Sequence, residues 1–241
     1  MAIRDAQGLI RGKMGDIIFK VVNGKQVVYP APEKVKRSVL TRKSAKMFGV
    51  CSTQTSILMG KMRPWTGGKV DSRQAARLRG ACLNILRNNE KRGVVAADLD
   101  TADMSDLKGF EFNIHSPFTK YFQPEISVVE NQDNDVNIKI LGYVPAQELE
   151  FPKLCGHVDV QILVLHHNFS SNKTLHVLDE HWEVKKSADF EKERQFTFPS
   201  MIDSGITLVV VQLLFFKNKS KFGKEYLNDK NCFPAQIVYA R

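Results

Sequence analysis

From Val94 to the C-terminus, hydrophobic residues alternate with polar ones in short runs, and this pattern constrains the fold most strongly. Successive side chains of a strand point to opposite faces, so such runs predict strands with one buried face. The segments that fit are GFEFNIH, PEISVVE, DVNIKILGYV, HVDVQILVLHH, TLHVLDEHWEV, RQFTFP, ITLVVVQLLFFK and AQIVYA. Without helices between them, they predict an antiparallel β-sandwich. Immunoglobulin-like topology is one option, although the Cys…Trp…Cys pattern of antibody domains is missing.

The N-terminal part carries a different signal, that of a β-hairpin. Asn23 and Gly24 lie between DIIFKVV and KQVVYP. An Asn-Gly pair readily adopts the two positive φ angles of a type I′ turn, whose twist suits a hairpin. The glycine-rich stretch GLIRGKMGD before it lacks the G-K-[ST] ending of a phosphate-binding loop. After the hairpin, Pro30 and Pro32 predict an extended, exposed connector.

Two helices are predicted after the connector. The first spans residues 41–62, begins at Thr41 or Ser44 as its N-cap, and ends before Pro64. Its apolar face consists of Ala45, Phe48, Cys51, Leu58 and Met62. The second opens at Asp71 in a sequence typical of a capping box. Its apolar stripe consists of Leu78, Ala81, Ile85 and Leu86.

Charge is divided unevenly along the chain. Residues 1–93 carry 20 Lys and Arg against 5 Asp and Glu, whereas residues 94–241 carry 15 basic and 21 acidic residues. We therefore predict an α+β protein with a basic hairpin–helix module over residues 1–93 and an antiparallel β-sandwich domain over residues 94–241. Basic residues that only solvate helix faces would give part of this pattern. The acidic part could also neutralise the basic part, within one molecule or between neighbours.

Membrane insertion and disulfide bonding find no support in the sequence. The N-terminus lacks the apolar core of a signal peptide, and the longest apolar run, residues 205–216, is too short to span a bilayer as a helix. The four cysteines are scattered without C-x-x-C spacing, which argues against a disulfide framework or a zinc site. These features predict a soluble, cytoplasmic protein with no membrane partner.

An enzymatic function rests on weak evidence. CGHVD would place Cys155, His157 and Asp159 on one face of a strand. Alternate positions on one strand diverge too far to form a compact metal site or nucleophile pair unaided. Other polar residues nearby are His166, His167, His176, His181, Asp179, Glu180 and Glu183. Packing and surface roles explain them more simply, so we expect no enzyme, no metal and no cofactor.

The N-terminal residues also show a family resemblance. The residues that carry it are Gly12, Lys13, Gly15, Asp16, Phe19, Asn23, Gly24, Lys25, Val28, Pro32 and Phe48. The segment resembles the start of uncharacterised proteins of Bacteroidetes and their prophages: G-x-x-G-K-x-G-[DN]-x-[VI]-[FY], a glycine turn, a basic connector and a Thr/Gln-rich helix start. It covers about the first sixty residues, and the family's R-T-P-A-Q helix start appears here as LTRKSAKMF. The resemblance implies a β-rich C-terminal domain and a mobile-element background, but no activity.

The excess positive charge predicts that the N-terminal module binds nucleic acid or another polyanion. Few aromatic residues lie in this region, which favours phosphate contact with a duplex over stacking on single strands. The residues expected to make contact are Lys13, Lys20, Lys25, Lys34, Lys36, Arg37, Arg42, Lys43, Lys46, Arg73 and Arg77. The alternative is a structural subunit of a phage-like or filamentous assembly, a homo-oligomer whose hairpin and arm join a neighbouring subunit.

Overall fold

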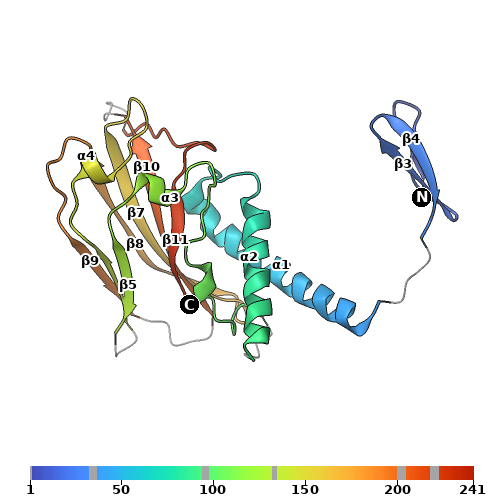
Figure 1. Ribbon diagram of the computed structural model, residues 1–241, viewed down its shortest axis with the longest axis horizontal. Helices are drawn as coiled ribbons and strands as arrows, with labels where there is room; N and C mark the ends of the chain where they lie inside the picture. Colours follow the sequence, from blue (N-terminus) through green and yellow to red (C-terminus); the bar gives the residue numbers. More distant parts are fainter. Residues whose placement is uncertain (1, 33–36, 94–97, 132–134, 200–204, 218–222) are drawn as a thin grey trace. The chain divides into compact units, whose positions relative to one another are not determined.

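The protein is described by a computed structural model over residues 2–32, 37–93, 98–131, 135–199, 205–217 and 223–241 (Figure 1). Nothing is described of the side chains of residues 176–178. Two compact units, Met1–Ser44 and Ala45–Arg241, divide the chain. Helices and antiparallel sheets together give the α+β class that the sequence predicts.

The N-terminal unit contains a four-stranded antiparallel sheet in the order β1-β2-β3-β4. Its strands are β1 (Ile3–Arg4), β2 (Ile10–Met14), β3 (Ile17–Val22) and β4 (Lys25–Pro30). Between β3 and β4, Asn23 and Gly24 have φ angles of 52° and 76°, and Val22 pairs with Lys25. The predicted hairpin is therefore confirmed, with the two positive φ angles of its turn supplied by Asn-Gly. The predicted connector falls partly on residues 33–36, outside the described residues.

Helix α1 (Val39–Thr66) is longer than predicted. The backbone N–H of Thr41 donates to Ser38 Oγ at 3.1 Å, so Ser38 is the N-cap, and not Thr41 or Ser44. The helix also continues past Pro64 and ends before Gly67, which has a φ of 55°. Pro64 thus lies in the last turn of the helix, two residues before its end at Thr66. Phe48 is 49% exposed, so it does not belong to the buried face of α1, which begins at Cys51.

Helix α2 (Gln74–Lys91) begins three residues after Asp71, the predicted opening position. Asp71 instead forms the turn before the helix, where its Oδ1 accepts the Arg73 N–H at 2.7 Å. The buried hydrophobic side chains of α2 are Leu78, Cys82, Ile85 and Leu86. Cys82 thus takes the central position in the stripe, and Ala81 is only half-buried.

Two further antiparallel sheets make up the rest of the second unit. One has the order β11-β10-β7-β8 and the other β5-β6-β9. Their strands are β5 (Ile126–Glu130), β6 (Val136–Ile140), β7 (His157–Asn168), β8 (Lys173–Lys185), β9 (Arg194–Phe198), β10 (Ile206–Phe216) and β11 (Ala235–Ala240). Two short helices, η1 (Ser105–Leu107) and α3 (Phe118–Tyr121), precede β5, and α4 (Pro145–Glu148) lies between β6 and β7. In Figure 1, α1 and α2 lie on one side of the sheet β11-β10-β7-β8, and the sheet β5-β6-β9 lies on its other side.

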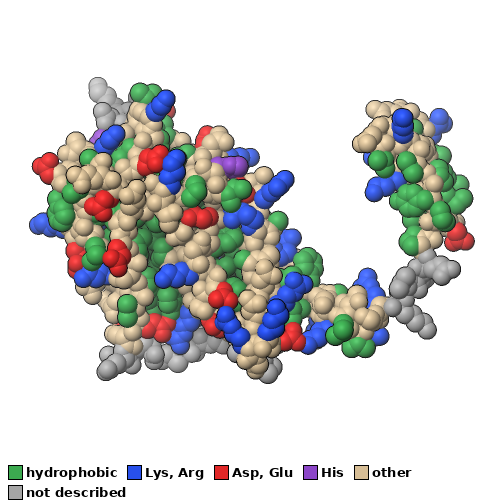
Figure 2. Space-filling model, viewed as in Figure 1, with side chains coloured by type: hydrophobic (Ala, Val, Ile, Leu, Met, Phe, Trp, Pro, Cys, Tyr) green, Lys and Arg blue, Asp and Glu red, His purple; other side chains and the backbone are tan. Residues whose placement is uncertain are grey.

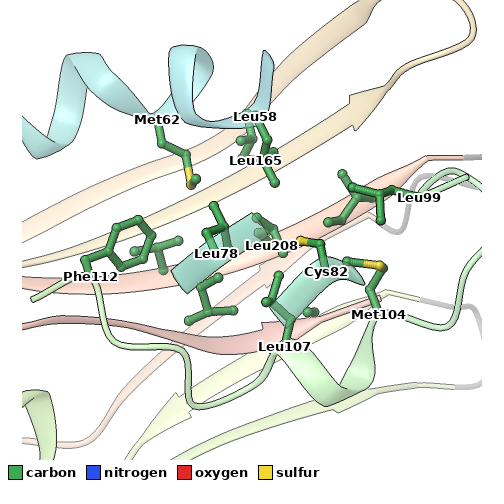
Figure 3. Close-up of a cluster of buried hydrophobic side chains, with 14 of the residues drawn as sticks. Leu58, Met62, Leu78, Cys82, Leu99, Met104, Leu107, Phe112, Leu165 and Leu208 are labelled. Carbon is green, nitrogen blue, oxygen red and sulfur yellow. The ribbon is translucent and has the colours of Figure 1, made fainter. Parts of the chain in front are cut away.

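Strand β10 is the centre of the hydrophobic core because all of its residues are buried. Leu208 and Val210 point to the helices and join a cluster with Leu58 and Leu78 (Figure 3). The alternate residues point to the three-stranded sheet and join a second cluster with β6 and β7. A strand covered on both faces needs no polar alternation, which explains why residues 205–216 are apolar apart from Thr207 and Gln212.

The packing of the helices also bears on domain organisation. From Ala45 onward, α1 belongs to the same compact unit as the sheets. The predicted boundary after residue 93 does not coincide with this division, because the apolar faces of both helices are buried against β7, β10 and β11. A helix whose apolar stripe packs on a sheet shares that sheet's core.

The segment 109–115 differs from the predicted strand. It runs beside β11 as irregular backbone with one bridge, Glu111 to Gln236. The N–H of Gly109 donates to Ile237 O at 2.7 Å, and the N–H of Phe112 donates to Ala235 O at 2.9 Å. Gly109 has a φ of 87°, which breaks regular strand geometry. The segment nevertheless covers the edge of β11, and a covered edge is protected from pairing with another chain.

We predict that Leu58→Ala lowers the free energy of unfolding of the whole second unit by about 3 kcal/mol. The reason is that the Leu58 side chain of α1 is fully buried in the cluster that α1 shares with the sheet β11-β10-β7-β8. Urea unfolding followed by circular dichroism and tryptophan fluorescence measures this loss. Leu154→Ala is the matched control, since Leu154 is 87% exposed. If the β-rich part unfolded at an unchanged midpoint in Leu58→Ala, helix and sheet would not share a core.

Candidate nucleic-acid interface

One face of the N-terminal sheet carries three of the predicted lysines. Strand register places Lys13 opposite Ile18, Val27 opposite Lys20, and Lys25 opposite Val22. Ile18, Lys20 and Val22 alternate along β3 and so point to one side. Residues directly opposite each other share a face, so Lys13, Lys20 and Lys25 lie on that same side. All three are exposed.

The three lysines are not neutralised within the described part of the chain. The ion pair of the sheet joins Arg11 Nε to Asp5 Oδ2 at 3.1 Å. Within the described residues of the N-terminal unit, no carboxylate forms a salt bridge with Lys13, Lys20 or Lys25. Figure 2 shows basic and hydrophobic side chains together on the surface of this unit. Free, exposed ammonium groups on one face are what a contact with phosphates requires.

The opposite face of the sheet is uncharged over β3 and its pairing partners. Met14 lies opposite Ile17, and Phe19 lies opposite Val28. Met14 is 61% exposed and Val28 is 53% exposed. None of the described residues of this unit is buried. The sheet is therefore amphipathic but has no core of its own, and a small sheet without a packed apolar face is marginally stable in water.

Other predicted contact residues are distributed beyond the sheet. Lys34 and Lys36 lie outside the described residues. Arg37 is exposed just before α1, and Arg42, Lys43 and Lys46 are exposed in the first turns of α1. Arg42 and Lys46 are four residues apart in the helix, so they lie on the same side of it. Arg73, at the N-cap of α2, is also exposed.

Arg77 has a structural role. Its guanidinium donates to Asp71 Oδ2 and, at 2.8 Å, to the backbone oxygen of Glu111. It also lies 5.1 Å from the ring centroid of Phe110. Arg77 thus holds the turn before α2 against the segment beside β11, and it does not belong to the exposed basic surface. Sequence reasoning missed this, because Glu111 meets Arg77 only through the tertiary fold, and Asp71, six residues before Arg77, is predicted as a helix cap.

Asp71 is the buried carboxylate of this ion pair. Burial alone would raise its pKa, but the hydrogen bonds from Arg77 and from the Arg73 N–H outweigh burial, so the pKa lies below its usual value. A depressed carboxyl pKa stabilises the fold above the unfolded-state pKa, and this contribution is lost as the pH falls through the folded-state pKa.

We predict that Asp71→Asn lowers the free energy of unfolding by about 2 kcal/mol near neutral pH, because Arg77 is left partly buried without its carboxylate. The difference from the wild type should shrink as the pH falls below the usual Asp value of 3.8. Urea titrations at several pH values measure it, with Asp106→Asn as an exposed control. A difference that stays constant down to pH 3 would contradict the assigned ion pair.

Three of the residues considered for catalysis, Cys155, His166 and His167, form hydrogen bonds within the fold. Cys155 Sγ donates to His157 O at 3.0 Å, and burial raises the pKa of this thiol, which disfavours the thiolate. His166 and His167 hydrogen-bond the hydroxyls of Thr207 and Thr174 at 2.9 and 2.8 Å. Within the described ranges, no group of three His, Cys, Asp or Glu residues is placed to hold a metal ion.

Comparison with known proteins gives no relative: no family model, no curated protein and no solved structure matches the chain. The resemblance of residues 12–48 to Bacteroidetes and prophage proteins stays a prediction. In the part of the chain that the structure covers, none of the helices combines the length and the apolar character needed to cross a bilayer.

Proposed function

We propose that this protein is a non-enzymatic binding protein whose N-terminal module contacts nucleic acid. The observation that carries the proposal is the common face of Lys13, Lys20 and Lys25, all exposed and without an ion-pair partner among described residues. Met1–Ser44 holds 10 Lys and Arg against 3 Asp and Glu. This excess of positive charge favours phosphate over any neutral ligand.

The arrangement suits a duplex and contact through its backbone. A two-stranded β-ribbon fits the major groove of B-DNA, and the hairpin of β3 and β4 carries Lys20 and Lys25 on one face. Lysine is a flexible point charge without the bidentate geometry that reads bases. Tyr29 shares this face, opposite Ile18, but one aromatic residue gives little stacking. The contact would therefore be largely independent of sequence.

We predict that the triple variant Lys13→Gln, Lys20→Gln, Lys25→Gln binds random duplex DNA at least about tenfold more weakly at low salt. Loss of three phosphate contacts should also reduce the slope of log K against log salt by roughly 2–3. Fluorescence anisotropy at several salt concentrations measures both. The matched control replaces Lys108, Lys153 and Lys230, which are exposed lysines of the second unit. Equal affinity and slope in both triple variants would reject the lysine face as the contact.

A second proposed function is that of a structural subunit in a phage-like or filamentous assembly, and it rests on the uncharged face of the same sheet. Exposed apolar patches mark association sites, and Met14, Ile17, Phe19 and Val28 share this face. We propose a second copy of this chain as its occupant. Over β2 to β4 two such faces can meet without like-charge repulsion, because the lysines point away from the contact and Arg4 lies on β1 at the edge of the sheet.

We predict that Val28→Lys shifts the protein to a smaller species in light scattering, because it places a charge inside the contact. Val27→Lys is the matched control, since Val27 is the neighbouring residue on the lysine face of β4. A monomeric wild-type protein at high concentration would reject the assembly function. That result would leave binding to nucleic acid unaffected.

We also propose that β5 to β11 form an immunoglobulin-like β-sandwich. The orders β5-β6-β9 and β11-β10-β7-β8 correspond to strands A-B-E and G-F-C of that topology, with β8 added beside strand C as in variable domains. Support also comes from the hydrophobic cluster that both sheets share. Such a domain would present the N-terminal module from a rigid body.

A further inference from the structure

A compact group of ionisable side chains lies at one end of the sheet β11-β10-β7-β8. Asp159 on β7 is paired with Glu183 on β8, so both side chains lie on the same face. Lys224, in the segment between β10 and β11, brings its Nζ to 2.6 Å and 2.8 Å from the two carboxylate oxygens of Asp159. The same Nζ lies 3.4 Å from Glu183 Oε2.

The surroundings shield the Asp159 carboxylate from water, while Lys224 and Glu183 are partly exposed. The side chain of Asp159 is 1% exposed. The Nζ of Lys224 lies 4.5 Å from the centroid of the Phe216 ring, on which the ring of His157 also stacks. Tyr226 donates its hydroxyl to Asp159 Oδ2 at 2.8 Å. An amine and a carboxyl group are thus held in contact under aromatic side chains, with a second carboxylate beside them.

The backbone fixes the lysine in this place. Tyr226 forms a bridge with Phe216 of β10, and the N–H of Leu227 donates to Phe215 O at 2.8 Å. These contacts hold the residues two and three positions after Lys224 against the end of β10, and β10 is the hydrogen-bonded neighbour of β7. Holding two reactants in contact replaces a bimolecular encounter by an intramolecular one, which lowers the barrier by several kcal/mol, about 7 or more in favourable cases.

We propose that Lys224 and Asp159 condense to an intramolecular isopeptide bond, with Glu183 carrying the protons. The Lys224 ammonium gives one proton to the Asp159 carboxylate. The Nζ lone pair then attacks Cγ of the resulting carboxyl group and forms the N–C bond. A second Nζ proton passes through Glu183 to the carboxyl OH, the C–O bond breaks, and water leaves. A neutral secondary amide replaces the ion pair, so atoms and charge balance.

The neighbouring groups fit the steps of this reaction. A general base must lie within hydrogen-bond reach of the proton that it moves, directly or through a small shift, and Glu183 adjoins Nζ. Negative charge develops on the Asp159 oxygen during the attack, and the Tyr226 hydroxyl already points to Oδ2. Burial, together with its bond to Asp159, raises the pKa of Tyr226 to about 12, so this phenol stays protonated as a donor. Exclusion of water disfavours the reverse hydrolysis.

An ordinary buried ion pair is the competing interpretation, and the mass of the protein separates the two. Intact mass spectrometry of the full-length, denatured protein is expected to give the sequence mass minus one water molecule. Protease digestion is expected to yield one branched peptide in which residues 159 and 224 are joined. A wild-type protein with the full sequence mass and no branched peptide, after prolonged incubation in the folded state, would overturn the proposal.

Three variants sharpen the test. Lys224→Arg keeps the positive charge beside Asp159 but supplies no nucleophilic amine, so the full mass is expected. Glu183→Gln keeps the shape without a proton carrier, and its yield of branched peptide should fall at least about tenfold. Lys217→Arg, an exposed neighbour at the end of β10, should lose water like the wild type.

Each result has one meaning. Water loss in Lys224→Arg would overturn the assigned nucleophile, and a wild-type yield in Glu183→Gln would overturn the assigned proton carrier. Circular dichroism confirms that each variant is folded. If Lys224→Arg does not fold, the branched peptide of the wild-type protein still decides whether the bond exists.

Discussion

The burial of β10 on both of its faces is the constraint on which the rest of the second unit depends. Its helix-facing residues pack with α1 and α2, and the alternate residues pack with β6 and β7. Apolar area removed from water is the main favourable contribution to folding. Since one strand supplies both clusters, neither layer can separate without exposing it. The helices therefore share the core of the second unit, although the charge pattern of the sequence groups them with the basic N-terminal module.

The N-terminal sheet follows the opposite principle, because it folds without a buried side chain among its described residues. Its local turn chemistry and register are well defined, but its two faces differ: three lysines project from one, and uncharged apolar side chains cover the other. The proposed nucleic-acid binding would use the first face and the proposed assembly the second, so the two proposals do not compete for the same residues. A sheet of this size gains stability when one of its faces is covered.

In the ionic group of Asp159, Glu183 and Lys224, the side chain of Asp159 is 1% exposed. Removing such charges from water is costly, and a buried ion pair often contributes less to stability than apolar packing would. Condensation would remove both charges of the Lys–Asp pair and would link β7 to the segment after β10. A covalent link of this kind restricts the unfolded chain, much as a disulfide does. The proposed bond would thus account for an ion pair whose burial is otherwise unfavourable.

The sequence by itself determined the local structure: the Asn-Gly turn, both helices and the strands β5 to β11 follow from turn chemistry and from the period of apolar residues, which act over a few neighbours. It failed at Ser38, Pro64 and Gly109, where capping and backbone geometry set the ends. For the candidate site, strand alternation sufficed to place Lys20, but the shared face with Lys13 and Lys25 required the register. Only the tertiary structure decided that Arg77 is tied to Asp71, that the helices join the sheets, and that Lys224 meets Asp159. The last two of these contacts join residues far apart in the chain, and no short-range pattern records which of many possible partners the packed core brings together.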